Sequence, residues 1–472
     1  MSTHSTDLAV LGAGPGGYAA AFLAADLGMK VALIDTEPNP GGVCVYRGCI
    51  PSKALLHAAK LLTEAKHASA WGLHFGEPRI EIDKLRGWKD QVVSKLTGGT
   101  GQLTKLRKVQ YIQGRASISD ATSFEVETAR GREHVEFKHA ILATGSRPAT
   151  VPSLAIGSTR VMDSTSALEL ADVPGRLLVV GGGYIGLELG TVYAALGSKV
   201  TVVEMLPGLL PGADRDLVNV LAKRVDAMCE HVYLSTKVVA LREEADGLHV
   251  TLENENLERR EELFDKVLVS VGRKPNSAIP GLDKTKVEVD GRGFIKVDAR
   301  LQTAEPTIYA IGDVVGEPML AHKASHEGRV AVEAIHGEDV VFAPAAIPAV
   351  VFTDPELAWC GLTEEQAKKE GRRVEIAKFP WGASGRAMTL DRTDGLTKLV
   401  IEPGTERVLG VGLVGSGAGE LIAEGVLAIE MGAVVSDLKM TIHPHPTLSE
   451  TVMEAGEIFF GQSTHAYRPR KK

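Results

Sequence analysis

Cysteine is scarce in this chain, and its scarcity excludes a fold built on disulfides. Only four cysteines occur among 472 residues, whereas small disulfide-dependent secreted domains carry many more for their length. Cys229 and Cys360 stand alone, and we interpret both as small buried hydrophobic residues. Cys44 and Cys49 lie five positions apart. A close pair of this kind in a long chain indicates catalysis or metal binding.

Long hydrophobic runs and extended charge clusters are also missing. The most apolar stretches are broken by glycines and by Glu188, so we expect no membrane span. No signal or transit peptide is recognisable at the N-terminus, which predicts a cytoplasmic protein. The net charge is −8, which argues against a nucleic-acid partner. The basic residues form one short cluster, interpreted as a solvated end, at Arg468, Arg470, Lys471 and Lys472.

One pattern of residues occurs twice. Residues 8–35 and 177–204 each run as an apolar strand, a glycine-rich turn, a helix, a second strand and an acid. The defining residues are Gly12, Gly14, Gly17 and Asp35 in the first copy and Gly181, Gly183, Gly186 and Glu204 in the second. In both copies the first glycine and the acid are 23 positions apart. This spacing predicts an internal repeat of a βαβ unit.

The residue types of the repeat suit a dinucleotide. The glycines allow a tight turn, admit a pyrophosphate and let helix pack on strand, while the acid accepts from a ribose hydroxyl. The helix N-terminus favours the anion. No arginine is adjacent to Glu204 to receive a 2′-phosphate, and the carboxylate of Glu204 would repel one. We therefore predict two dinucleotide sites, with NAD favoured over NADP in the second.

Three further strands end in glycine, at residues 140–146, 267–273 and 308–314. Open α/β sheets bind ligands at the carboxyl ends of their strands, although each such glycine could also be an ordinary turn. The additional candidate cofactor contacts are Thr144, Gly145, Ser146, Gly272, Gly312, Asp313 and Ala321. Among them, Asp313 offers an acceptor for cofactor hydroxyls.

The two close cysteines need a break in regular structure if they are to bond. Five residues of α-helix rise about 7.5 Å, which exceeds the roughly 7 Å between Cα atoms that a disulfide tolerates. Gly48 supplies flexibility and Pro51 suits a helix start. A thiol near a helix N-terminus has a lowered pKa and is reactive.

Three uses of the cysteine pair can be compared. As a structural disulfide, the pair would close too short a loop to stabilise the fold much. As a metal site, it lacks two further soft ligands nearby. A redox role is favoured, because the pair directly follows the first dinucleotide unit. A nicotinamide delivers a hydride and a disulfide takes two electrons, so a flavin is the natural converter. We expect FAD in the first unit and NAD in the second.

Two histidine patterns remain. Thr447 and Glu450 fit a capping box, but Glu450 could equally orient His445 as an acid–base pair, and the residues alone leave both open. His322 and His326 have the spacing of a helical metal site. No third ligand is evident for them, and we predict no metal site.

Taken in order, these segments resemble the flavoprotein disulfide reductases, in particular the members that oxidise dihydrolipoamide. The resemblance covers essentially the whole chain. Its motifs include "GAGPGG", "GGVCVYRGCIPSKALL", "ATGSRP", "GGGYIGLELG", "AIGDV", "LAHKASHEG" and "HPHPTLSE". It implies an α/β fold with two Rossmann-like domains and a C-terminal α+β dimerisation domain. The expected boundaries are 1–150 for the FAD domain, 151–277 for the NAD domain, 278–346 for a segment completing the FAD domain, and 347–472 for the dimerisation domain.

The resemblance also implies roles for individual residues. Cys49 would face the flavin and Cys44 would exchange with substrate. Lys53 and Glu188 would pair beside the flavin ring, and Asp313 would bind the ribitol of FAD.

In a homodimer, His445 with Glu450 would be the acid–base pair, with each histidine serving the partner's site. The resemblance implies a substrate, lipoamide on lipoyl domains or a carrier protein, and a host, a 2-oxo acid dehydrogenase or glycine cleavage complex. Tyr46 and Arg47 depart from the commoner pattern between the cysteines. The alternatives are another flavin-dependent NAD(P)H:disulfide reductase and a non-catalytic FAD/NAD-binding redox sensor.

Overall fold

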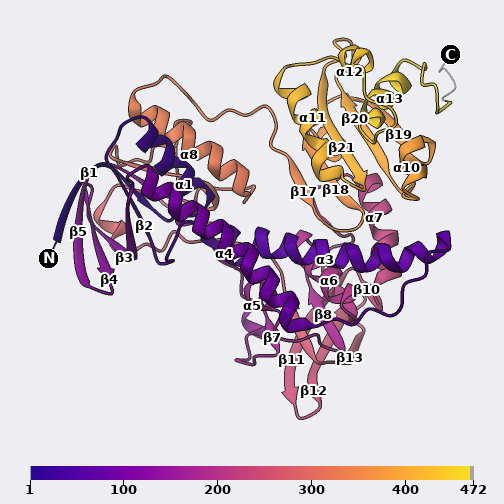
Figure 1. The fold of residues 1–472 in the computed structure, drawn as a ribbon, viewed down its shortest axis with the longest axis horizontal. Helices are drawn as coiled ribbons and strands as arrows, with labels where there is room; N and C mark the ends of the chain where they lie inside the picture. Colours follow the sequence, from indigo (N-terminus) through magenta and orange to yellow (C-terminus); the bar gives the residue numbers. More distant parts are fainter. Residues whose placement is uncertain (1, 468–472) are drawn as a thin grey trace.

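The structure is a computed structural model that describes residues 2–467. The basic cluster at 468–472 lies outside these residues. Figure 1 shows three bodies: the N-terminal strands on the left, the middle of the chain at the lower centre, and the C-terminal elements in yellow at the upper right. No helix among the described residues is both long and apolar enough to cross a membrane.

The first body is built on a sheet whose parallel strands are ordered β3–β2–β1–β5–β16. The apolar run in β1 is fully buried, as expected for a parallel strand covered on both faces. Beyond the parallel part, β3, β4 and β5 continue as an antiparallel meander. The strands are β1 (Ser2–Leu11), β2 (Val31–Asp35), β3 (Gln110–Asp120), β4 (Ser123–Thr128), β5 (Gly131–Leu142) and β16 (Ile308–Ala310).

Helices α1 (Pro15–Asp26) and α8 (Ala321–His336) lie side by side on this body (Figure 1). Glycines make their close packing possible. A Cβ on Gly16 would lie 2.8 Å from the carbonyl oxygen of Ala324, and a Cβ on Gly328 would lie 2.6 Å from that of Gly16. The chain therefore returns to its first dinucleotide unit some three hundred residues later, bringing β16 and α8 to it.

The second body repeats this order, with parallel strands β10–β9–β8–β14–β7. As in the first body, the strand before the glycine turn is central. The predicted internal repeat is confirmed. The parallel strands are β7 (Val161–Met162), β8 (Arg176–Val180), β9 (Lys199–Val203), β10 (His231–Tyr233) and β14 (Lys266–Val269). A separate antiparallel layer consists of β11 (Thr236–Glu244), β12 (Gly247–Asn254) and β13 (Arg259–Phe264). The helices are α5 (Ser164–Glu169), α6 (Tyr184–Ala195) and α7 (Arg215–Met228).

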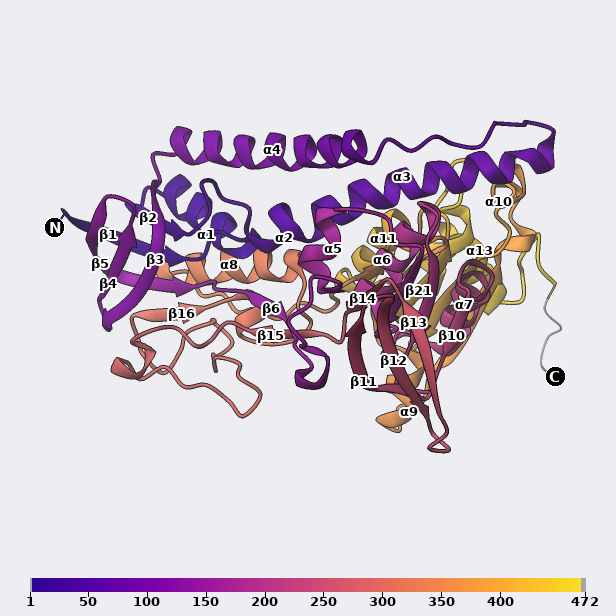
Figure 2. The ribbon, with the colours of Figure 1, turned by 90° about the horizontal axis from the view of Figure 1, so that it is seen from below.

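The segment with the cysteine pair joins the two bodies. Helix α2 (Gly42–Arg47) is short, and α3 (Cys49–His67) runs from the first body along α6 of the second. Figure 2 shows α3 and α4 (Ile82–Leu106) along one side of the molecule. A two-stranded link, β6 (Ser146–Pro148) with β15 (Arg273–Pro275), also connects the bodies.

The third body is an antiparallel sheet, ordered β17–β18–β21–β20–β19, with helices packed on it. Its strands are β17 (Ala349–Val351), β18 (Glu356–Gly361), β19 (Glu375–Pro380), β20 (Leu396–Ile401) and β21 (Val408–Gly415); its helices are α9 (Glu364–Lys369), α10 (Gly385–Thr389), α11 (Ala418–Glu430), α12 (Val435–Met440) and α13 (Glu450–Phe459). The predicted fold class is thereby confirmed.

Candidate active site

A cavity opens at the carboxyl edge of the first sheet and reaches the start of α3 and α6. Residues expected from the sequence line it from several elements. They are Gly12, Gly14, Gly17, Asp35, Cys44, Cys49, Lys53, Thr144, Gly145, Ser146, Glu188, Gly312, Asp313 and Ala321. Both cysteines and the first dinucleotide turn therefore share one cavity.

The first glycine turn has the shape that a dinucleotide requires. A Cβ on Gly12 would lie 2.3 Å from the carbonyl oxygen of Ala143, and one on Gly17 would lie 1.8 Å from that of Gly12. A Cβ on Gly14 would meet nothing within 4 Å. The outer glycines are thus needed for packing, whereas Gly14 leaves room for a ligand against the backbone. Helix α1 has no side-chain cap and no acid in its first turn, which suits a diphosphate.

Two acidic side chains in the lining of the cavity, Asp35 and Asp313, are held by hydrogen bonds. Asp35 accepts hydrogen bonds from the N–H groups of Ala13 at 2.6 Å and Glu37 at 3.0 Å, while burial raises its pKa. Asp313 accepts from the hydroxyl of Ser146. The guanidinium of Arg273 donates in turn to that hydroxyl at 2.7 Å, which fixes its orientation.

The break that the cysteine spacing requires is present. Cys44 lies on α2, Gly48 interrupts the helical backbone, and Cys49 is the first residue of α3. The two cysteines are not joined by a disulfide in this structure, and each is close enough to shift the pKa of the other.

The two thiols differ strongly in acidity. The hydrogen bond from Cys44, assisted by the ammonium of Lys53, lowers the pKa of Cys49 to about 7 against the effect of burial. The same hydrogen bond and burial raise the pKa of Cys44. Cys49 is therefore the sulfur that carries negative charge near neutral pH, and the first residue of a helix is a favourable place for it.

Lys53 and Glu188 form an ion pair of 2.6 Å beside the cysteines. Only 4% of the Glu188 side chain is exposed. Its carboxylate also accepts from the Ser52 hydroxyl at 3.1 Å and from the N–H of Phe352 at 2.9 Å. The Lys53 ammonium lies 4.5 Å from the centre of the Phe352 ring. Ser52 and Phe352 were not foreseen; Phe352 stands in the "AVVFTDPE" segment, which carries no local signal for this contact.

The second glycine turn repeats the first. A Cβ on Gly181 would lie 2.5 Å from the carbonyl oxygen of Ser270, one on Gly186 would lie 2.2 Å from that of Gly181, and one on Gly183 would meet nothing within 4 Å. Gly272, at φ +110°, follows the strand beside this turn.

The acid of the second unit is also held as in the first. Glu204 accepts from the N–H groups of Gly182 and Leu206, both at 2.7 Å. These are the positions that correspond to Ala13 and Glu37 beside Asp35.

His445 and Glu450 lie together on the third body. The His445 ring nitrogen Nδ1 is 2.9 Å from one Glu450 oxygen, and the other oxygen accepts from the N–H of Thr447 at 2.7 Å. Burial opposes these contacts, yet they hold the pKa of Glu450 below its usual value. The His445 side chain is 72% exposed and does not line the cavity described above. Helix α13 begins at Glu450 itself, so Glu450 is not the third helical residue that the capping box required.

The two lone cysteines and His322 do not line the cavity described above. Cys229 and Cys360 are buried, as expected. The ring of His322 contacts the carbonyl oxygen of Pro348 at 2.8 Å, and burial lowers its pKa.

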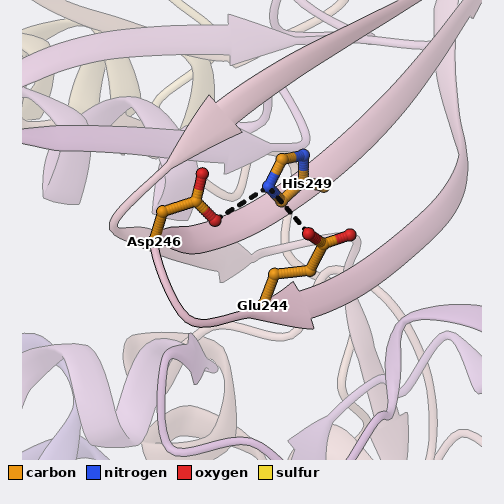
Figure 3. A group of neighbouring side chains, drawn as sticks. All are labelled: Glu244, Asp246 and His249. Carbon is orange, nitrogen blue, oxygen red and sulfur yellow. Dashed lines mark hydrogen bonds and ion pairs between the residues drawn. The ribbon is translucent and has the colours of Figure 1, made fainter.

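Among the described residues, one group could offer three metal ligands: Glu244, Asp246 and His249 (Figure 3). Its charges are already paired within the β11–β13 layer. The His249 Nδ1 atom lies 3.1 Å from Glu261, and Arg242 binds both Glu244 and Glu261. We interpret this group as an ion-pair network.

The third body carries apolar side chains on its surface. Those of Leu427, Met431, Met440 and Ile442 are all more than half exposed. They lie on or next to α11 and α12. Such a surface favours association with another protein chain.

Known proteins resemble this chain over nearly its whole length. A family model described as pyridine nucleotide-disulphide oxidoreductase matches residues 6–328, and the dimerisation domain of the same family matches residues 347–456. The chain belongs to the pyridine nucleotide-disulphide oxidoreductase family. Membership implies that FAD is bound and that a pyridine nucleotide is a substrate, rather than a second resident cofactor. The matched dimerisation domain supports a homodimer.

Individual members of the family are similar as well. A dihydrolipoyl dehydrogenase of Vibrio cholerae is 49% identical over 96% of each chain, and one of Thermus scotoductus is 48% identical over 98% of this chain and 99% of its own. The solved structure of LpdA from Mycobacterium tuberculosis has a TM-score of 0.89 at 26% identity, covering 97% of this chain and 100% of its own.

Proposed function

We propose that this protein is a dihydrolipoyl dehydrogenase: it oxidises dihydrolipoamide to lipoamide and passes the electrons through Cys44 and Cys49 and FAD to NAD⁺, giving NADH. The observation that carries this proposal is the shared cavity, in which a cysteine pair and a dinucleotide turn lie together. Similarity to dihydrolipoyl dehydrogenases over almost the full length supports it.

The residues around the cavity fit FAD. Gly14 leaves backbone open for the diphosphate, Asp35 suits the adenosine ribose, and Asp313 with Ser146 suits the ribitol hydroxyls. Lys53 and Glu188 line the same cavity, close enough to Cys49 to act on its charge. When bound, FAD supplies a two-electron carrier between a dithiol and a nicotinamide.

The side chains of the protein account for the thiol chemistry. A substrate thiol, with a pKa of about 8.5, is mostly protonated at neutral pH and needs a base. His445 takes the proton, and Glu450 orients its ring. The substrate thiolate attacks Cys44 of the oxidised pair and displaces Cys49 as a thiolate. The second substrate thiolate then attacks the mixed disulfide, which releases lipoamide and the reduced pair.

The position of His445 favours a site shared between two chains. His445 is highly exposed and lies away from the cavity of its own chain. We propose that it serves Cys44 of the partner, with the apolar surface around Met431 and Ile442 at the interface.

NAD is favoured over NADP by the surroundings of Glu204. Its carboxylate is fixed at the end of β9 by two backbone N–H groups. The nearest arginine in sequence, Arg215, already donates to the carbonyl oxygens of Leu209, Leu210 and Ala213. A 2′-phosphate would therefore meet a carboxylate, and the guanidinium of Arg215 is already engaged elsewhere.

The proposed activity also bears on the partner protein and on the cellular compartment. Lipoamide would be presented on a lipoyl domain or carrier protein of a 2-oxo acid dehydrogenase or glycine cleavage complex. The unpaired, buried Cys229 and Cys360 favour a reducing compartment, the cytoplasm. We retain domain boundaries at 150, 277 and 346.

The test is NADH formation from dihydrolipoamide by the purified holoenzyme, with NADP⁺ and reduced glutathione as alternative partners. The proposal expects rapid turnover only with dihydrolipoamide and NAD⁺. Turnover with glutathione or NADP⁺ instead would favour another disulfide reductase. Flavin bound without any thiol turnover would favour the redox sensor.

A further inference from the structure

The segment between the cysteines makes two contacts that the proposed reaction does not explain. The guanidinium of Arg47 forms an ion pair with Glu37, and the Tyr46 hydroxyl donates to the carbonyl oxygen of Asn39 at 3.1 Å. Both partners lie in the loop between β2 and α2. We call these two contacts the α2 strap.

The loop side of the strap is itself anchored. The Tyr111 hydroxyl of β3 donates to the carbonyl oxygen of Glu37 at 2.8 Å, and the Thr100 hydroxyl of α4 donates to that of Pro40 at 2.6 Å. The strap therefore ties α2 to a loop that neighbouring elements already hold.

The strap shares the cavity lining with Asp35, the residue that suits the adenosine ribose of FAD. Arg47 and Glu37 line the cavity together with Asp35, and the Arg47 charge acts on Asp35. Loss of Arg47 would leave the carboxylate of Glu37 without its ion-pair partner and would remove a positive charge that acts on Asp35.

Helix α2 also abuts the nucleotide turn directly. A Cβ on Gly42, its first residue, would lie 2.5 Å from the Cα of Gly14. Any loosening of α2 therefore changes the space beside Gly14, where a ligand meets the backbone.

We propose that the α2 strap retains FAD, with Arg47 and Glu37 acting as one unit. The closed strap holds α2 against the nucleotide turn, beside Gly14. This inference rests on the proposed FAD site but not on the identity of the thiol substrate.

The first test measures FAD release. Holoenzyme is diluted into a flavin-binding trap protein, and the rate of FAD loss is followed spectroscopically. Arg47→Val should release FAD at least ten times faster than the wild type, and Arg47→Lys should restore part of the difference. The matched control is Arg372→Val, because the Arg372–Glu402 ion pair has similar exposure and lies on the third body; its rate should stay within twofold of the wild type.

A second set of variants tests whether the pair acts as a unit. Glu37→Gln should accelerate FAD release about as much as Arg47→Val, and the double variant should be no faster than either. Equal release rates for wild type and Arg47→Val would overturn the proposal, as would an unaffected Glu37→Gln. A wild-type protein that binds no FAD would instead contradict the proposed function, so the two failures are distinguishable.

Discussion

The ammonium of Lys53 lies 2.6 Å from the carboxylate of Glu188. This ion pair joins α3, which begins at the cysteine pair, to α6, which begins at the second glycine turn. Lys53 lies in the second turn of α3, which begins at Cys49, and Glu188 lies in α6, which begins after the second glycine turn. The buried end of this ion pair also receives hydrogen bonds from Ser52 and Phe352. One carboxylate thus connects the cysteine segment, the nucleotide-binding body and the third body.

Glu188→Gln should therefore weaken the whole assembly. Breaking a fully buried pair costs about 3–5 kcal/mol, and the partial exposure of Lys53 reduces the expected loss to roughly 2 kcal/mol. Thermal unfolding of the holoenzyme at a fixed scan rate should show a midpoint lower by a few degrees. Asp339→Asn, which removes an ion pair between a fully exposed carboxylate and Arg300, is the control and should leave the midpoint unchanged. Similar midpoints for both variants would contradict this account of Glu188.

Cys49→Ser should abolish dihydrolipoamide turnover, because the hydroxyl cannot form the disulfide or leave as a stable anion. We expect at least a thousandfold loss in kcat with FAD still bound, measured by NADH formation and by the flavin spectrum. Cys360→Ser changes a buried cysteine outside the cavity and should keep most of the turnover of any protein that folds. A Cys49→Ser enzyme with normal turnover would refute the assigned role.

Alkylation of the reduced enzyme should follow the acidity of Cys49. Because its pKa is lowered to about 7, the thiolate fraction and the iodoacetamide rate should rise through pH 7 and level off near pH 8. Peptide mapping should find the label on Cys49 first, since the pKa of Cys44 is raised. Lys53→Gln removes a cation that lowers the pKa of Cys49 and should move the midpoint to higher pH. An unchanged midpoint in that variant would show that Lys53 has no electrostatic effect on the thiol.

Glu204→Gln should weaken discrimination between NAD and NADP. The amide keeps an acceptor for one backbone N–H but removes the charge that repels a 2′-phosphate. The ratio of kcat/KM for the two nucleotides should fall about tenfold, which corresponds to about 1.4 kcal/mol. The comparison is made by steady-state kinetics on both proteins. A ratio that does not change would place the discrimination elsewhere.

Mixed dimers can locate the base. Chains carrying His445→Gln and chains carrying Cys44→Ser should each be nearly inactive alone. If His445 serves the partner's cysteines, a heterodimer of the two contains one intact site and should regain about half of the wild-type activity. An inactive heterodimer would instead place the base in the same chain as the cysteines it serves. In that case, a dimer with both changes on one chain and a wild-type partner chain should be active.

Local patterns predicted the parts of the fold that local residues determine. The glycine turns and their acids could be predicted from spacing, because the first and third glycines of each turn are required by close contacts within the same βαβ unit or with an adjacent strand. The break at Gly48 followed from helix geometry together with the assumption that the two cysteines can bond. These features depend on few residues and leave a distinct trace in the sequence.

Contacts between distant segments left no such trace. Glu188 and the N–H of Phe352 are separated by 164 positions, and a backbone N–H has no residue type to recognise. The link between Arg47 and Glu37 spans only ten positions, but the intervening loop obscures it. The two oxygens of Glu450 contact the N–H of Thr447 and the ring of His445 separately, and the acid–base role of this pair stays a prediction.

The most direct test of the central claim follows one turnover under anaerobic conditions. The reduction of the enzyme by dihydrolipoamide and its reoxidation by NAD⁺ are carried out as separate steps. One equivalent of dihydrolipoamide per chain is added to oxidised holoenzyme, and samples are alkylated and mapped before and after one equivalent of NAD⁺. The account predicts that Cys44 and Cys49 become alkylatable after the first addition, and that the second yields one NADH per chain as both close again. NADH formed while Cys44 and Cys49 stay closed throughout would contradict it.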